Sequence, residues 1–217
     1  MKIIRANAEI LRPAPTQEAV EAIYRNIEIA GRTCYKSEDK ITPESARKFV
    51  KGLIKRGHEA MIEHATMTVR FTVDRGVSHE IVRHRIASYA QESTRYCRYS
   101  DDKFGNELTF IKPCFWEEDS AHYNEWLGAM RVAETVYLGM LSAGVKPEEA
   151  RSVLPNSLKT ELIVTANMRE WRSIFKLRAA GVTGKPHPQM LEVMIPLLKQ
   201  CQELMPEIFG DIEINNE

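Results

Sequence analysis

The chain lacks an excess of charge of either sign. Its 217 residues include 30 Lys plus Arg and 30 Asp plus Glu, so the formal net charge is zero. Proteins that coat nucleic acid by bulk charge usually carry a clear basic excess, and the balance argues against that class. An apolar fraction of 43% with 28% charged residues is ordinary for a globular protein and argues against a largely disordered chain.

Long apolar runs are also missing. No run approaches the roughly 18 residues that cross a bilayer. The first 13 residues contain basic side chains but no apolar segment of the kind found in secretory signals. We therefore expect a cytoplasmic protein without membrane contacts.

Cysteine is scarce, and no CxxC motif is present among Cys34, Cys97, Cys114 and Cys201. A zinc ribbon or thioredoxin-like site is unsupported, and we expect most of these residues to be buried, reduced thiols. The segment GHEAMIEH at 57–64 superficially resembles a zinc-protease motif. Its histidines are six residues apart, however, not the four that place both on one helical face. We predict no metal site.

Repeats, low-complexity tracts and Gly/Ser linkers are absent, which predicts a single domain over residues 1–217. Residues 65–73 alternate between apolar and polar side chains, as in a half-buried strand of an antiparallel sheet. Weaker signals predict strands at 2–10, 107–112 and 159–168. Helical spacing predicts helices that begin at N-caps Thr16, Thr42 and Asp74, the last of them running to about Arg85, and further helices over 120–143, 169–178 and 187–205. Without GxGxxG or a regular βαβ rhythm, we predict an α+β fold in which helices pack on an antiparallel sheet.

The densest chemistry lies in residues 83–98, where His84 and four arginines accompany a single acid, Glu92. The planar guanidinium binds phosphates and carboxylates well and keeps its charge when buried. These arginines follow a predicted helix, so one alternative is that they only cap its C-terminus and pair with surface acids. Nearby Ser, Gln and Tyr side chains favour a ligand site.

A second basic cluster occupies residues 167–178. Arg169, Arg172 and Lys176 share one stripe of the predicted helix, and a solvated basic face is the simpler interpretation. Asn167 at a strand end and Arg178 after an apolar pair favour a binding role. Ser93 is not predicted to be a nucleophile, because no GxSxG elbow or identifiable base accompanies it.

Arg83-His84-Arg85, seven residues and then Ser93, followed by Arg95 and Tyr96, resembles the signature of flavin-dependent thymidylate synthases. GHE…EH at 57–64, ARxVLP at 150–155 and Asn167-x-Arg169 before Leu177-Arg178 agree in order and spacing. The resemblance covers roughly residues 30–190. It implies an α+β homotetramer with shared active sites that methylates dUMP to dTMP. Methylenetetrahydrofolate would supply the carbon, and FAD reduced by NADPH would carry the hydride.

The resemblance also implies roles for individual residues. Arg178 would promote ionisation of the uracil N3, so that no covalent nucleophile is needed. The backbone from Glu92 to Arg95 would hold the phosphate, and His58 would lie close to the flavin ring. The implied dUMP-binding residues are Glu80, Arg83, Gln91, Glu92, Ser93, Thr94, Arg95, Arg151 and Arg178. The implied FAD-binding residues are His58, Glu63, Arg83, His84, Arg85, Gln91, Asn167 and Arg169.

The sequence departs from the family pattern at Cys34, Ala60, Ala90 and Ser173. These changes put single cofactor hydrogen bonds in doubt but leave the arginines intact. Two other functions stay open. One is a nucleic-acid-binding module that uses residues 83–98 as a basic, tyrosine-interleaved strip. The other is a flavin enzyme that methylates a related pyrimidine nucleotide.

Overall fold

A computed structural model describes residues 1–101 and 105–214. The chain forms two compact units. Unit 1 contains Met1–Asn7, Phe71–Arg83 and Ala90–Leu162, and unit 2 contains Ala8–Arg70, His84–Tyr89 and Ile163–Glu217. The chain passes between the units inside four strands, and once more between Arg83 and His84, in a segment that joins a helix to the next strand.

The main sheet is antiparallel and has the order β2-β3-β6-β4. Its strands are β2 (Asn7–Arg12), β3 (Thr66–Asp74), β6 (Lys159–Asn167) and β4 (Ala87–Gln91). The predicted alternation in β3 is confirmed, since Met67, Val69, Phe71 and Val73 are fully buried. Two of the strands lead directly into helices whose N-caps are Asp74 and Asn167. The ends of β3 and β6 therefore fix where α3 and α6 begin.

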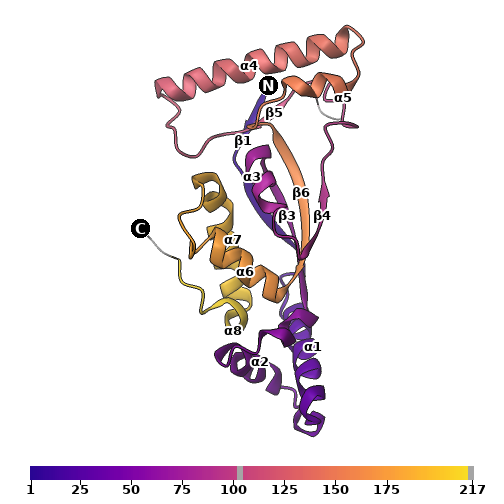
Figure 1. Cartoon of the computed structure of the whole chain (residues 1–217), viewed down its shortest axis with the longest axis vertical. Helices are drawn as coiled ribbons and strands as arrows, with labels where there is room; N and C mark the ends of the chain where they lie inside the picture. The colour runs from indigo at the N-terminus through magenta and orange to yellow at the C-terminus, as the bar shows by residue number, and fades with distance from the viewer. Residues whose placement is uncertain (102–104, 215–217) are drawn as a thin grey trace. The chain divides into compact units, whose positions relative to one another are not determined.

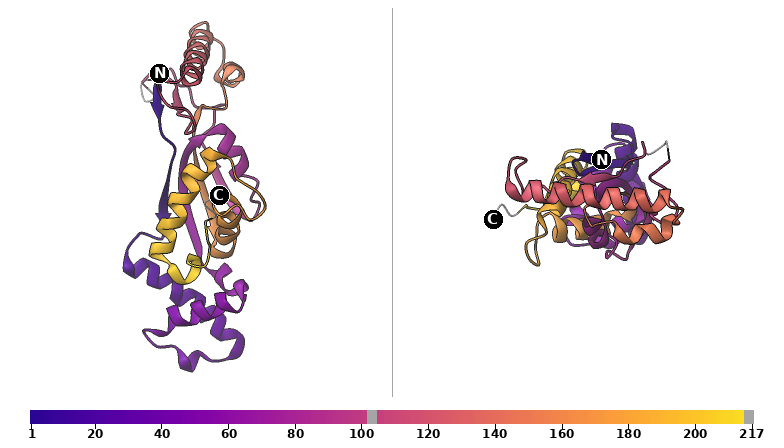
Figure 2. Two further views of the ribbon diagram at one scale, coloured as in Figure 1. Left: turned by 90° about the vertical axis from the view of Figure 1, so that its left-hand side faces the viewer. Right: turned by 90° about the horizontal axis from the view of Figure 1, so that it is seen from above.

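Unit 2 contains most of the helices (Figures 1 and 2). They are α1 (Gln17–Tyr35), η1 (Glu38–Lys40), α2 (Ser45–Lys55), η2 (Glu59–His64), α6 (Met168–Arg178), α7 (Pro188–Leu204) and α8 (Pro206–Phe209). Helix α1 packs on α2 and on η2, and α6 packs on η2 and on α7. Trp171, Phe175 and Phe209 stack in the core of this unit. The short helix η2 thus has α1 on one side and α6 on another.

Unit 1 is built around the long helix α4 (Ala121–Ser142), which packs its aromatic side chains over the parallel pair β1 (Lys2–Ile4) and β5 (Thr109–Ile111). Figure 1 shows α4 beside this pair and the short helix α5 (Pro147–Ala150). The turn η4 (Arg151–Val153) follows α5, and α3 (Arg75–Ile81) completes the unit. The core includes Phe110, Tyr123, Trp126 and Tyr137.

The structure corrects several local predictions. The strand expected at 2–10 is two strands, and the helix expected to reach Arg85 ends at Ile81. Thr42 does not cap α2, which begins at Ser45 with Glu44 at the N-cap position. Strand β4 was not predicted, because residues 87–91 carry mixed polar side chains that pair with β6 through the backbone.

The prediction that most cysteines are buried is wrong. Cys201 is buried, whereas Cys34 and Cys114 are exposed and Cys97 is partly buried; all four are free thiols. Burial raises the pKa of the Cys201 thiol to about 12, so that thiol is unreactive.

Candidate active site

Two sequence motifs meet in unit 2. The Nε atom of Arg178, at the end of α6, donates a hydrogen bond of 3.1 Å to Nε2 of His84, 94 residues earlier in the chain. The His84 side chain is only 8% exposed, and the Tyr89 hydroxyl donates to its backbone carbonyl. Helix α3 ends before His84, so the chain turns there and brings the middle residue of Arg83-His84-Arg85 to α6.

His84 is neutral at physiological pH. Burial, together with the nearby charge on Arg178, lowers its pKa from 6.5 to about 4. The neighbouring Glu170 carboxylate, whose Oε1 lies 3.7 Å from the His84 Nδ1, does not reverse this. Burial raises the pKa of Glu170 itself. The positive charge of this cluster therefore resides on Arg178.

A cavity of about 620 Å³ lies beside α6. Its lining includes three of the residues expected to bind FAD: Glu63, Asn167 and Arg169. Arg169 Nη1 donates to Glu63 Oε1 at 2.6 Å, and Asn167 Oδ1 accepts from the Glu170 amide at 2.8 Å. The other lining residues are Glu59, Ile86, Glu170, Ser173, Lys176, Leu177 and Val182. The cavity combines two cations and one side-chain amide with three carboxylates and an apolar wall.

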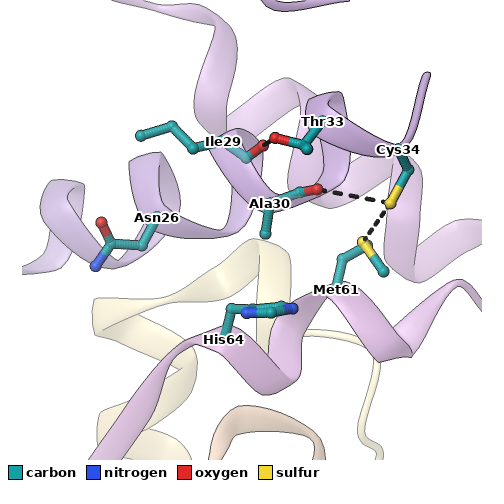
Figure 3. A pocket seen from close by; sticks show the side chains of 7 residues that line it. All are labelled: Asn26, Ile29, Ala30, Thr33, Cys34, Met61 and His64. Atoms are coloured by element: carbon teal, nitrogen blue, oxygen red, sulfur yellow. Dashed lines mark hydrogen bonds between the residues drawn. The ribbon is translucent and has the colours of Figure 1, made fainter. Parts of the chain in front are cut away.

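His58 belongs to a different cavity, of about 290 Å³, that also contains Cys34 and Ala60. A third cavity of about 540 Å³ lies between α1 and η2. Figure 3 shows its side chains: Cys34 Sγ lies 3.7 Å from Met61 Sδ, and His64 projects from η2 towards α1. The structure thus separates His58 from Glu63, Asn167 and Arg169, although all of them lie in unit 2.

Most of the other predicted residues, including Gln91 and Glu92, lie in unit 1. Gln91 Nε2 donates to Ser78 Oγ at 3.0 Å and to Thr160 Oγ1 at 3.3 Å. The Glu92 carboxylate accepts from Lys159 Nζ and from the Tyr99 hydroxyl, each at 2.9 Å. These bonds anchor the start of the loop that follows β4.

That loop is a compact turn. Ser93 Oγ accepts from the Arg95 amide at 3.2 Å, and the Ser93 carbonyl accepts from the amides of Tyr96 and Cys97. Thr94 is 7% exposed. Arg95 Nε pairs with Glu148 Oε2 at 3.0 Å on the solvent side. We expected the backbone amides from Glu92 to Arg95 to bind a phosphate. The Glu92 and Arg95 amides already donate to protein oxygens, which leaves the amides of Ser93 and Thr94 for that role.

The remaining predicted residues are more accessible. In unit 1, Glu80 is half-buried on α3, whereas Arg83 and Arg151 are exposed. In unit 2, Arg85 is exposed next to the buried His84. Exposed arginines of this kind are suited to anionic ligands.

The interpretation of residues 169–176 as a solvated basic face is wrong for Arg172. This guanidinium is 2% exposed and forms a bidentate pair with Asp211, at 2.6 and 2.8 Å, and a 3.1 Å bond with Glu59. It also donates to the carbonyl of Ile208. Arg172 is a core residue of unit 2, and Arg169 is the exposed member of the stripe.

Sequence reasoning missed two residues of the cluster. Neither Glu170 nor Tyr89 is among the site residues that the sequence predicts. No spacing in the chain predicts that both face His84. Among the described residues, no group of three or more His, Cys, Asp or Glu side chains could hold a metal ion. None of the helices in that part of the chain is long and apolar enough to span a membrane.

Residues 19–207 match the model of a protein family described as thymidylate synthase complementing protein. A flavin-dependent thymidylate synthase of Pyrococcus furiosus is 36% identical over 151 residues, which cover 68% of this chain and 60% of that protein. Another from Geobacter sulfurreducens is 30% identical over 209 residues, or 93% of this chain and 84% of that one. The chain belongs to the flavin-dependent thymidylate synthase family.

A solved structure supports the fold of this family. The UMP/dUMP methylase PolB from Streptomyces cacaoi, bound with 5-Br dUMP, matches with a TM-score of 0.73 over 97% of this chain and 96% of that chain. The sequence identity is 22%, so this match concerns the fold alone. Within the thymidylate synthase family, the expectations of an α+β fold and of a flavoprotein methyltransferase are confirmed.

Proposed function

We propose that this protein converts dUMP to dTMP, with methylenetetrahydrofolate as the carbon donor and FAD, reduced by NADPH, as the hydride carrier. The observation that carries the proposal is the bond between Arg178 and His84, which joins the Arg-His-Arg motif to the second basic cluster. We also propose a cytoplasmic homotetramer of single-domain chains whose active sites combine residues of several subunits.

The residues of unit 2 fit a flavin cofactor. A dinucleotide needs cations or amide donors for its phosphates and apolar surface for its ring. The 620 Å³ cavity offers Arg169, Lys176 and Asn167 for the first and Ile86, Leu177 and Val182 for the second. FAD would supply the redox chemistry that side chains lack. Glu63 holds Arg169 in place through the 2.6 Å bond, and His58 and Arg85 are exposed for further contacts.

Arg178 is the residue that we assign to activation of the uracil. Carbon C5 of uracil is a poor nucleophile, and a cation beside N3 and O2 stabilises the anion that forms there. Because His84 is neutral and accepts from Nε, it orients the guanidinium without adding a competing charge. No serine or cysteine nucleophile is required in this scheme.

The loop after β4 is assigned to the nucleotide phosphate. The Glu92 carboxylate, held by Lys159 and Tyr99, anchors the loop, and Gln91 is fixed by Ser78 and Thr160. The amides of Ser93 and Thr94, with the guanidinium groups of Arg83, Arg95 and Arg151, would then contact dUMP. Glu80, half-buried on α3, would also contact the nucleotide.

An absorption spectrum and a product assay test this function. The purified protein should be yellow, release FAD on denaturation, and form dTMP from dUMP when methylenetetrahydrofolate and NADPH are supplied. A colourless protein that neither binds added FAD nor forms dTMP would contradict the proposal. Sedimentation equilibrium tests the tetramer.

A second candidate is methylation of UMP. The PolB structure is described as that of a UMP/dUMP methylase, and arginine contacts to a phosphate do not discriminate between sugars. Comparing kcat/KM for dUMP, UMP and dCMP decides between the substrates. A preference for UMP would replace the dTMP assignment and keep the flavin.

Replacing Arg178 tests its role. Arg178→Ala should lower kcat/KM about 100-fold or more, because it removes the cation beside the developing anion. Arg178→Lys should recover only part of the activity, since a lysine keeps the charge but lacks the planar fork. Bound FAD and the circular dichroism spectrum serve as controls for folding. Full activity of Arg178→Ala would remove the proposed role.

A further inference from the structure

The imidazole of His84 lies between two side chains of the same helix. Arg178 Nε is 3.1 Å from Nε2, and Glu170 Oε1 is 3.7 Å from Nδ1. Residues eight apart on a helix are separated by about 12 Å along its axis, so a ring flanked by both bridges two turns of α6. The Tyr89 hydroxyl holds the His84 backbone carbonyl from β4.

The two ring nitrogens of His84, Nε2 and Nδ1, are not equivalent. A guanidinium Nε–H is always a donor, so Nε2 of His84 must be an acceptor. A neutral imidazole carries one proton, and here it must reside on Nδ1, the nitrogen that faces Glu170. The opposite tautomer would place two donors against each other and break the contact with Arg178.

Glu170 is built into this position. It lies in the first turn of α6, where a negative charge is favoured by the helix dipole, and its amide is held by Asn167 Oδ1. Its side chain is only 13% exposed. Burial raises the pKa of this carboxyl, which means that the buried charge costs free energy of folding. An uncharged residue at this position would avoid that cost.

We propose that Glu170 is a positioning residue for Arg178: its carboxylate, 3.7 Å from Nδ1, attracts the Nδ1–H of His84 electrostatically, favours that tautomer and thereby keeps Nε2 as the acceptor for the Arg178 guanidinium. The proposal rests on the proposed function for its catalytic consequence, because it is Arg178 that activates the uracil there.

Nitrogen NMR of labelled histidine tests the tautomer directly in the full-length protein without substrate. The His84 resonances are assigned by their loss in His84→Gln. The wild type should show a proton on Nδ1 of His84. In Glu170→Gln the side-chain amide can turn and donate to Nδ1, so the Nε2–H tautomer should become populated. A wild-type His84 in the Nε2–H form overturns the proposal without any variant.

Kinetics give the second readout. Glu170→Gln should lower kcat/KM for dUMP, expressed per bound FAD, about tenfold, whereas Glu203→Gln, the same change at an exposed position on α7, should leave it unaltered. A Glu170→Gln protein that matches Glu203→Gln in both tautomer and kcat/KM overturns the proposal. The tautomer is measured without substrate, so its failure is distinguishable from failure of the proposed function.

Discussion

At the scale of single residues, Arg172 and Arg178 show how differently one helix uses two arginines. Burial alone would lower the pKa of Arg172, but its bonds to Asp211 and its proximity to Glu59 more than offset this, and the pKa is raised. Arg172 is therefore a permanent cation that ties α6 to the segment after α8. Arg178 ends the same helix with a neutral histidine as its partner.

Removing the Arg172 guanidinium should be costly. Arg172→Met removes the donor to the Ile208 carbonyl and the bonds to Asp211 and Glu59, and we expect a loss of about 3 kcal/mol in the free energy of unfolding. Urea denaturation measures it. Arg25→Met, at an exposed position on α1, is the matched control and should change stability by less than about 0.5 kcal/mol. Equal stability of the two variants would contradict the core role of Arg172.

His84 should make stability depend on pH. Its pKa is lowered from 6.5 to about 4 on folding, so between these values the unfolded chain binds more protons than the folded one. The contribution of His84 is fully present above pH 6.5 and is lost as the pH falls towards 4, with a slope of up to about 1.4 kcal/mol per pH unit.

Urea denaturation at pH 7 and pH 5 tests this. The wild type should lose about 2 kcal/mol more than His84→Gln over that interval. His58→Gln, which changes an exposed histidine, should behave as the wild type does. A wild type and His84→Gln with parallel pH profiles would show that His84 titrates normally.

At the scale of elements, helix starts differ in how well they are capped. Thr16 accepts a 3.3 Å hydrogen bond from the Ala19 amide at the N-terminus of α1, whereas Thr42 caps no helix. Both residues precede an apolar periodic segment, and only the backbone geometry separates them. Instead, Ser45 Oγ accepts a hydrogen bond from the Thr42 amide in the turn before α2.

Alanine substitutions should separate these two threonines. Thr16→Ala should destabilise the protein by about 1 kcal/mol because it removes the cap of a 19-residue helix. Thr42→Ala should cost less than about 0.5 kcal/mol. Thermal or urea unfolding of the two variants measures the difference. A larger loss for Thr42→Ala would restore the role that the sequence pattern indicates for it.

At the scale of the whole molecule, the two units are not separate stretches of chain. Two of the boundaries fall inside the longest strands, between Arg70 and Phe71 in β3 and between Leu162 and Ile163 in β6. Because each of these strands belongs to both units, loss of its pairing in one unit also weakens its pairing in the other. We therefore expect the chain to behave as the single domain that the sequence predicts.

Calorimetry tests this expectation. Unfolding should give one transition. The calorimetric enthalpy should equal the van't Hoff enthalpy when both are expressed per mole of the unit that unfolds cooperatively. Protein concentration must be varied, because dissociation of an oligomer also shifts the midpoint. Two resolved transitions at every concentration would show that the units unfold independently.

The sequence by itself determined the elements with strong local signals. The alternation in β3, the caps Thr16 and Asp74, and the end of α4 before Gly144 follow from side-chain periodicity and backbone preference, which act over a few residues. The family also followed from the sequence, because the Arg-His-Arg motif through Ser93 is specific. Which side chains are buried did not follow from the sequence, since the charged Arg172 is buried and Cys34 is exposed.

Only the tertiary structure decided which charges are paired and which nitrogen of His84 faces which partner. Arg169 and Arg172 share a helix stripe, yet one is exposed and the other buried, because the partners Asp211 and Glu59 come from distant segments. The contact between His84 and Arg178 likewise joins residues 94 positions apart. Local sequence sets which conformations the chain prefers, whereas contacts of this kind arise when packing closes long loops, and that information is absent from any short window of the chain.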